Sequence, residues 1–215
     1  NEYKAINLSQ GFPDFNCSEE LVDLVHHFMK NNFNQYAPMP GTIDLRKQIS
    51  HKVNRDYGHY YDAEKEITVT AGATQALYTA FSAIINNGDE VIIFEPAYDS
   101  YIPAIVANGG IPISIKLSAD DFSIPWKEVE KAITKNTKCI VINSPHNPTG
   151  AILNVSDILQ LQQIVKNTNI FLISDEVYEH IIFDNQEHCS FARYDELAKR
   201  SFIIKKKKKT FHTTG

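Results

Sequence analysis

The chain has 215 residues, of which 43% are apolar and 22% are charged, as in an ordinary globular protein. This length allows one domain or two small ones with a sizeable core. The net charge of −5 gives no electrostatic reason to expect nucleic acid or a membrane as a partner, and no apolar run approaches the ~18 residues of a membrane span.

The three cysteines, Cys17, Cys139 and Cys189, are odd in number and show no CxxC spacing, so we expect reduced thiols. No signal-peptide pattern opens the sequence, and the two observations together predict a cytoplasmic protein. Because the chain opens on Asn1 without methionine and stops at Gly215 in a loop-like stretch, we expect it to be a fragment.

The first regular patterns along the chain are two amphipathic helices. Ser18 can cap a helix that runs to about Asn31, because apolar residues recur on one face of this stretch. After a loop at residues 34–41 that contains two prolines, residues 43–57 form a second helical pattern that ends at Gly58.

From Glu66 onward, short β-rich runs alternate with helical patterns. The expected strands are residues 67–70, 91–94, 111–115, 139–143, 170–174 and 201–204. The expected helices are residues 75–86, about 98–108, 126–133 and 157–167, with Ser156 as the N-cap of the last. This alternation predicts an α/β fold in three αβα layers, with a mainly parallel sheet covered on both faces.

Two polar residues follow buried strands of the predicted sheet. Asn147 lies in Ser144-Pro-His-Asn-Pro-Thr-Gly150, and Asp175 follows the strand at 170–174, with Tyr178 three residues further on. Open α/β folds bind ligands outside the carboxyl ends of their strands, so we expect these groups at one ligand site. A carboxylate beside an amide and a phenol suits a flat, cationic, hydroxylated ring such as that of pyridoxal 5′-phosphate.

Several motifs in chain order resemble the fold-type I (class I and II) aminotransferases, and among them the methionine and kynurenine aminotransferase-like group. They are Asn7-Leu-Ser-Gln-Gly-Phe-Pro-Asp14, Gln35-Tyr-Ala-Pro-Met-Pro-Gly41, Thr70-Ala-Gly-Ala-Thr-Gln-Ala76 and the two runs above. The resemblance implies pyridoxal 5′-phosphate as cofactor and transfer of an amino group from an L-amino acid (methionine, aromatic or kynurenine-like) to a 2-oxo acid. It also implies that residues 1–33 belong to a small domain, mostly missing here, and residues 34–215 to the large cofactor domain.

The resemblance assigns the phosphate and the stacking contact to two motifs. The N–H groups of Ala73 and Thr74 would lie at the N-terminus of the helix expected at residues 75–86, where free donors and the positive dipole end can hold a phosphate. Tyr98 matches the aromatic residue that stacks on the cofactor ring. Each motif also has a purely structural reading, because Gly72 suits any tight turn and a tyrosine can simply cover a sheet edge.

Asp175 is assigned to the ring nitrogen, where a carboxylate keeps the nitrogen protonated and lets the ring withdraw electrons. Asn147 and Tyr178 are assigned to the phenolic oxygen, and Asn147 also to the substrate carboxylate, although most Asn-Pro pairs are only turns. A P-loop ATPase could place an acid like Asp175, but the chain lacks GxxxxGK[ST]. Glu179 and His180 could belong to a metal site, but no second group of ligands with metal-binding spacing appears in the sequence. A solvated acidic turn is therefore the simpler explanation.

By the same resemblance, Lys209 is the catalytic lysine that binds the cofactor covalently. The residues before it depart from the family pattern, because Lys205, Lys206, Lys207 and Lys208 replace small or polar residues, including a phosphate-binding serine at 206. Five adjacent ammonium groups near a buried cofactor repel one another and are costly to desolvate. A solvated tail or nuclear-import patch is the alternative reading of such a run.

Tyr36 matches a tyrosine that reaches the phosphate of the neighbouring subunit, which implies a homodimer. Gly11 and Phe12 match a lid over the substrate, although Phe12 could equally pack in a core. Two other functions remain open, a carbon–sulfur β-lyase that also uses pyridoxal phosphate and a non-catalytic cofactor-binding or regulatory module. We expect residues 1–215 alone to be inactive, because the family's carboxylate-binding arginine lies further along the chain.

Overall fold

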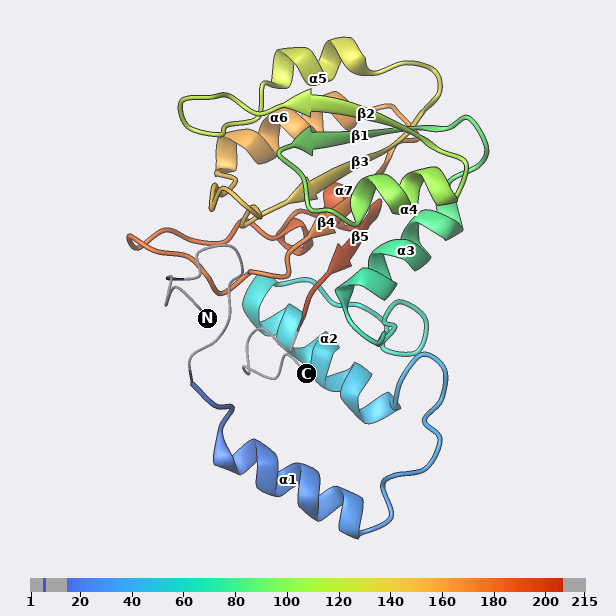
Figure 1. The fold of residues 1–215 in the computed structure, drawn as a ribbon, viewed down its shortest axis with the longest axis vertical. Coiled ribbons are helices and arrows are strands. Elements are labelled where there is room, and N and C mark those ends of the chain that lie inside the picture. Colours follow the sequence, from blue (N-terminus) through green and yellow to red (C-terminus); the bar gives the residue numbers. More distant parts are fainter. Residues whose placement is uncertain (1–5, 7–14, 207–215) are drawn as a thin grey trace. The chain divides into compact units, whose positions relative to one another are not determined.

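A computed structural model of the chain describes residue 6 and residues 15–206 (Figure 1). These residues form two compact units that divide between Tyr36 and Ala37. The described part of the first unit contains helix α1 (Glu19–Lys30). The hydroxyl of Ser18 caps this helix by accepting a hydrogen bond from the Leu21 N–H at 3.2 Å, so both the predicted helix and its cap are confirmed.

The second unit is built on a five-stranded sheet in the order β2-β1-β3-β4-β5, with every neighbouring pair parallel (Figure 1). The strands are β1 (Glu90–Glu95), β2 (Ile111–Lys116), β3 (Thr137–Asn143), β4 (Phe171–Asp175) and β5 (Ser201–Ile204). The helices are α2 (Ile43–Tyr57), α3 (Ala73–Ile84), α4 (Tyr101–Ala107), α5 (Trp126–Ala132), α6 (Val155–Val165) and α7 (Asp195–Ala198). The predicted α/β class with a parallel sheet is confirmed.

Both faces of the sheet are apolar, because successive residues of a strand point to opposite faces and each face carries helices. Ile92 and Ile140 belong to one buried core, which the sheet shares with α5, α6 and α7. Their chain neighbours Ile93 and Val141 belong to the other core, shared with α3 and α4. The continuous apolar runs of the sequence are therefore central strands buried on both faces.

The position of β1 in the sheet marks the expected place of a ligand site. The chain passes from β1 through α4 to β2 on one side, whereas β3, β4 and β5 follow on the other side. Sheets of this order bind ligands in the crevice outside the carboxyl ends of the two strands where the winding reverses. Here those strands are β1 and β3.

The prediction of a strand at residues 67–70 is wrong. No described strand pairs with these residues, and the N–H of Val69 instead donates to the Pro40 carbonyl at 2.9 Å. A β-rich stretch becomes a strand only where a neighbouring backbone completes the ladder, and residue composition alone does not supply that neighbour.

The expected N-cap of α6 is also wrong, since Asn154 and not Ser156 caps this helix. The Asn154 Oδ1 accepts from the Asp157 N–H at 3.1 Å, and the Asp157 carboxylate accepts from the Asn154 N–H at 2.9 Å. Ser156 lies inside the first turn. Asn and Ser are about equally good caps, so the reciprocal bond from Asp157 decides between them.

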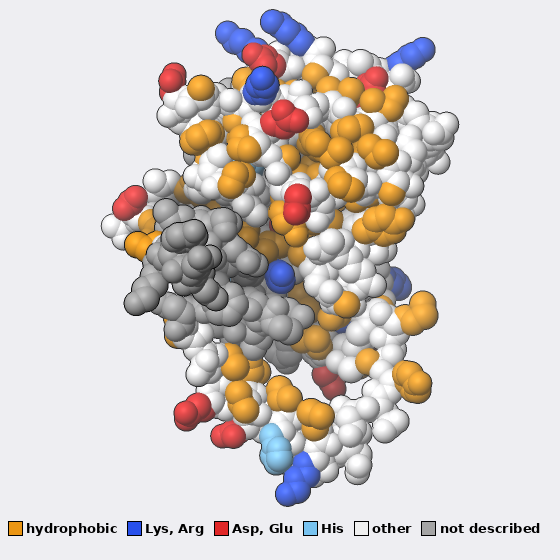
Figure 2. Space-filling view, viewed as in Figure 1, with side chains coloured by type: hydrophobic (Ala, Val, Ile, Leu, Met, Phe, Trp, Pro, Cys, Tyr) orange, Lys and Arg blue, Asp and Glu red, His pale blue; other side chains and the backbone are white. Residues whose placement is uncertain are grey.

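The remaining predicted helices exist, with ends shifted by a few residues, and the largest shift is at α4, which begins at Tyr101 and not near 98. The 3₁₀ turn η1 (Phe191–Arg193) and α7 were not predicted. Figure 2 shows apolar side chains exposed over the α4 side of the second unit, where Ile102 and Val106 are surface residues of this helix. None of the described helices is both long enough and apolar enough to cross a membrane.

Candidate cofactor site

Asp175 ends β4 directly opposite Asn143, the last residue of β3. Its carboxylate is buried, and it accepts hydrogen bonds from the Tyr101 hydroxyl at 2.7 Å and the Val177 N–H at 3.2 Å. Burial raises the pKa of this carboxyl group, while the two hydrogen bonds and the charge of Lys206 counteract the rise. Among the described residues no lysine, arginine or histidine forms an ion pair with Asp175. The site therefore presents a buried carboxylate that suits a cationic partner.

Tyr101 supports this carboxylate, and sequence reasoning missed it. The residue is 3% exposed, and burial together with the charge of Asp175 raises the pKa of its phenol strongly, so it remains a hydrogen-bond donor. Its ring lies edge-on to that of Tyr98, with 5.7 Å between the centroids. The available signal was its place three residues after Tyr98, but Tyr98 lies in the loop before α4 and Tyr101 is the first residue of the helix.

Asn143 is a second residue that sequence reasoning missed. Its Nδ2 donates to the Asp175 carbonyl at 2.9 Å, and its Oδ1 accepts from the Asn147 N–H at 2.7 Å. One amide thus fixes the loop that carries Asn147 against the end of β4. The signal in the sequence was a polar residue ending an apolar strand, but its partners depend on the strand register.

The amino end of α3 has the properties expected of a phosphate cradle. Gly72 precedes the helix with φ of 106°, a conformation that favours glycine. No side chain caps the helix, and no described residue accepts a hydrogen bond from the N–H groups of Ala73 or Thr74. The Thr74 hydroxyl lies 3.4 Å from the Tyr98 hydroxyl, so the cradle and the stacking residue are neighbours.

Tyr178 belongs to the same group of side chains. Burial raises the pKa of its phenol, and the charges of Asp175 and Tyr98 raise it further, so these three groups lie within electrostatic reach of one another. Contacts connect five of the predicted or newly found residues in the order Thr74, Tyr98, Tyr101, Asp175 and Asn143, and Asn143 continues to Asn147.

Other predicted site residues are not part of this geometry. Gly11, Phe12 and Lys209 lie outside the described residues. Tyr36 belongs to the first unit, and its side chain is exposed. Their assigned roles stay predictions.

A cavity of about 420 Å³ lies at the same edge of the sheet, lined mainly by the loops that follow β2, β3 and β4. Tyr101 and Asn143 border it, but Thr74, Tyr98, Asp175 and Tyr178 do not. His146 also lines it, and burial lowers the pKa of this imidazole. The cavity therefore adjoins the proposed cofactor site through Tyr101 and Asn143 but does not contain the residues expected to contact the cofactor.

The polar groups at this site fit pyridoxal 5′-phosphate. Asp175 offers a carboxylate to a protonated ring nitrogen, Tyr98 offers an aromatic face, and the open end of α3 offers N–H donors to a phosphate. These three features come from different segments and converge only in the folded unit.

Comparison with known proteins gives the same assignment. Residues 3–205 match the family described as aminotransferase class I and II. The chain is 44% identical to a methionine aminotransferase of Escherichia coli over 214 residues, which are 100% of this chain and 55% of that protein. It is 37% identical to a kynurenine–oxoglutarate transaminase of Dictyostelium discoideum over 232 residues, covering 100% of this chain and 53% of the other.

Solved structures agree in fold. The E. coli methionine aminotransferase superposes with a TM-score of 0.97 at 44% identity, covering 100% of this chain and 57% of that one. The N-succinyldiaminopimelate aminotransferase of Mycobacterium tuberculosis gives a TM-score of 0.94 at 36% identity, covering 100% and 56%. The chain spans about half the length of these relatives. With the family match over nearly all of its residues, the chain belongs to the aminotransferase class I and II family.

Proposed function

We propose that the protein is an aminotransferase that uses pyridoxal 5′-phosphate to move an amino group from an L-amino acid to a 2-oxo acid. The observation that carries this proposal is the buried carboxylate of Asp175 at the edge of the sheet, which forms no ion pair with any described side chain. Relatives named for methionine and kynurenine suggest methionine, aromatic or kynurenine-like amino acids as donors.

When bound, the cofactor supplies an electron sink for the pair released at the substrate α-carbon. Asp175 would hold the proton on the ring nitrogen, with Tyr101 keeping the carboxylate oriented. Asn147 and Tyr178 would hydrogen-bond the phenolic oxygen. Tyr98 would cover the ring face, which keeps water from it.

The remaining roles belong to the phosphate, the proton and the substrate. Ala73 and Thr74 would bind the phosphate through the amino end of α3. Lys209 would bind the cofactor and move the proton at the α-carbon. Gly11 and Phe12, with Asn147, would enclose the substrate and its carboxylate.

We also propose a homodimer in the cytoplasm, in which Tyr36 completes the phosphate site of the neighbouring subunit. The support for the dimer is the position of Tyr36 in the motif Gln35–Gly41, and the support for the compartment is the odd number of cysteines without CxxC spacing. Small-molecule amino acids and 2-oxo acids are the expected partners.

The test is an assay of the full-length protein, loaded with cofactor, using methionine, phenylalanine or kynurenine with several 2-oxo acids. We expect the donor's oxo acid to form only when an acceptor is present. Release of ammonia and pyruvate from a cysteine S-conjugate without any acceptor would instead establish the β-lyase. Cofactor binding without turnover of any pair would establish a non-catalytic module.

A further inference from the structure

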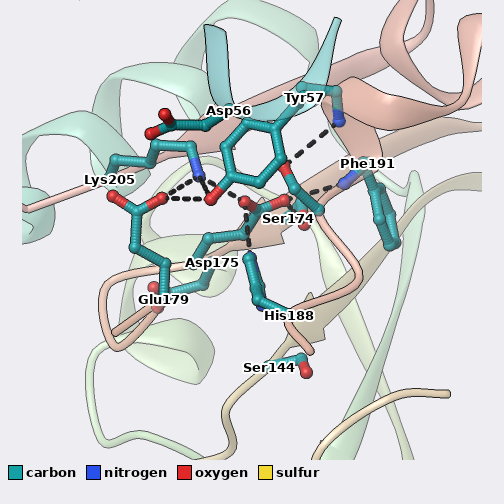
Figure 3. A network of polar contacts seen from close by, with 12 residues as sticks. Asp56, Tyr57, Ser144, Ser174, Asp175, Glu179, His188, Phe191 and Lys205 are labelled. Atoms are coloured by element: carbon teal, nitrogen blue, oxygen red, sulfur yellow. Dashed lines mark hydrogen bonds and ion pairs between the residues drawn. The ribbon is translucent and has the colours of Figure 1, made fainter. Parts of the chain in front are cut away.

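Lys205 is the first residue of the five-lysine run, and its environment differs from that of a solvated charge. It directly follows β5, and its side chain is only 13% exposed. The ammonium group lies 2.6 Å from Glu176 Oε2 and 2.5 Å from Glu179 Oε2 (Figure 3). It also lies 4.5 Å from the centroid of the Tyr57 ring. One cation therefore bridges two carboxylates that come from the turn after β4.

Glu176 depends strongly on this cation. Its carboxylate is 1% exposed and also accepts hydrogen bonds from the Ser174 hydroxyl at 3.0 Å and the Phe191 N–H at 3.0 Å. His188 contacts it at 2.9 Å and is its one other basic partner among the described side chains. Burial alone would raise the pKa of Glu176, but Lys205 and His188 outweigh it and lower the pKa to about 2. Lys205 thus allows a fully buried carboxylate to stay ionised.

Glu179 is tied in a similar way but has more partners. Its Oε1 pairs with Lys52 at 3.1 Å, and its Oε2 accepts from the Tyr57 hydroxyl at 2.6 Å. Burial again acts to raise its pKa, while Lys205 first and then Tyr57 and Lys52 bring it down to about 2. The Lys205 contacts therefore connect the end of β5 with α2 and with the turn after β4.

These contacts join the two segments that carry the proposed cofactor ligands. Glu176 directly follows Asp175, and Tyr178 lies between the two glutamates in the sequence. Lys205 itself precedes Lys209 by four residues. A displacement of the turn after β4 would therefore move Asp175 and Tyr178 relative to Tyr101 and Asn143, which contact Asp175.

We propose that Lys205 is a positioning residue, whose ion pairs with Glu176 and Glu179 hold Asp175 and Tyr178 in place against the end of β5. The proposal rests on the proposed function, because these residues are its cofactor ligands. Lys205, the first lysine of the run, thus has a role distinct from cofactor attachment, because its ammonium group pairs with two carboxylates. Errors of about 1 Å in such a constellation can cost up to about 100-fold in rate.

The experiment compares Lys205→Met and Lys205→Arg with the unchanged full-length protein. The matched control is Lys138→Met, because Lys138 also lies over an aromatic ring, that of Phe171 at 5.6 Å, but forms no ion pair with a described residue. For each protein we would measure the melting temperature without cofactor, the Kd for pyridoxal phosphate, the absorption spectrum of the bound cofactor against pH, and kcat and KM separately.

For Lys205→Met we expect kcat to fall about 10- to 100-fold, with KM for the amino acid changed less than about threefold. The cofactor Kd should rise and the pH titration of its absorption band should shift, because Asp175 and Tyr178 move relative to the ring. Lys205→Arg should recover part of each change, since it keeps the charge. The control should match the unchanged protein.

A lower melting temperature with unchanged cofactor spectrum, Kd and kcat would overturn the proposal, since Lys205 would then be a structural ion pair only. Covalent attachment of the cofactor to Lys205 would overturn it as well. If Lys205→Met does not fold, Glu179→Gln removes one arm of the bridge and should shift the spectrum in the same direction by a smaller amount; no shift would contradict the proposal. An unchanged protein that fails to bind the cofactor would refute the proposed function itself.

Discussion

At the scale of single residues, Asp175 is a buried carboxylate without a direct ion-pair partner among the described residues. Burial works against its ionisation, and the hydrogen bonds from Tyr101 and Val177, together with the charge of Lys206, only partly compensate. A protonated ring nitrogen would form a direct ion pair with this carboxylate, and in return the carboxylate would keep that nitrogen protonated.

Asp175→Asn should therefore keep cofactor binding and lose most of the turnover. An amide accepts and donates hydrogen bonds but cannot hold the proton on the ring nitrogen, so kcat should fall roughly 100-fold or more, equivalent to about 2.7 kcal/mol. Stopped-flow or steady-state kinetics on cofactor-loaded protein would measure this. The control is Asp121→Asn, which changes an acid of an exposed turn. Near-normal kcat in Asp175→Asn would contradict the electron-sink role.

The lowered pKa values of Glu176 and Glu179 predict a pH dependence of stability. Each carboxyl group has a pKa of about 2 in the folded protein, against an ordinary value of 4.5. Their contribution to the free energy of unfolding is therefore fully present above about pH 4.5 and is lost as the pH falls toward 2. Lys205→Met removes a cause of the lowering, and its acid unfolding midpoint should lie at higher pH. Circular dichroism during acid titration measures this, with Lys138→Met as control. Coincident midpoints for all proteins would contradict it.

At the scale of elements, the sequence predicted best what local pattern determines. Strands β1 and β3 are apolar on both faces, so their runs stand out without any knowledge of neighbours. Residues 67–70 have a similar composition but no described partner strand, and this depends on tertiary context. Tyr101 and Asn143 escaped prediction for the same reason, because their contacts with Asp175 exist only once the strands are in register.

The cap of α6 gives a direct test at this scale. Asn154→Ala removes the side-chain acceptor of the reciprocal pair with Asp157 and should lower the free energy of unfolding by about 1 kcal/mol. Ser156→Ala, at the residue that sequence reasoning selected, should cost no more than about 0.5 kcal/mol. Urea unfolding midpoints of the two variants measure the difference. A larger loss for Ser156→Ala would show that the cap is assigned to the wrong residue.

At the scale of the whole molecule, the proposed function requires two subunits, because Tyr36 is expected to serve the neighbouring site. Mixing Tyr36→Phe chains with Lys209→Ala chains should restore activity, since one site of each heterodimer then contains both intact residues. Random exchange gives about half heterodimers, so about one quarter of all sites recover. Chains that carry both substitutions, mixed with Lys209→Ala chains, are the control. No recovery after exchange, confirmed by mass spectrometry, would place Tyr36 in its own subunit's site or in a packing role.

The central claim is that one lysine of this chain binds pyridoxal phosphate beside Asp175, and borohydride reduction tests it most directly. Reduction makes the attachment permanent, and mass spectrometry then locates it. Because trypsin cuts within the lysine run, a protease that cleaves after Glu or aromatic residues should be used, so that residues 205–209 stay on one peptide. Fragmentation of this peptide should place the label on Lys209. A label on Lys205 or Lys206, or a folded full-length protein that acquires none, would contradict the account.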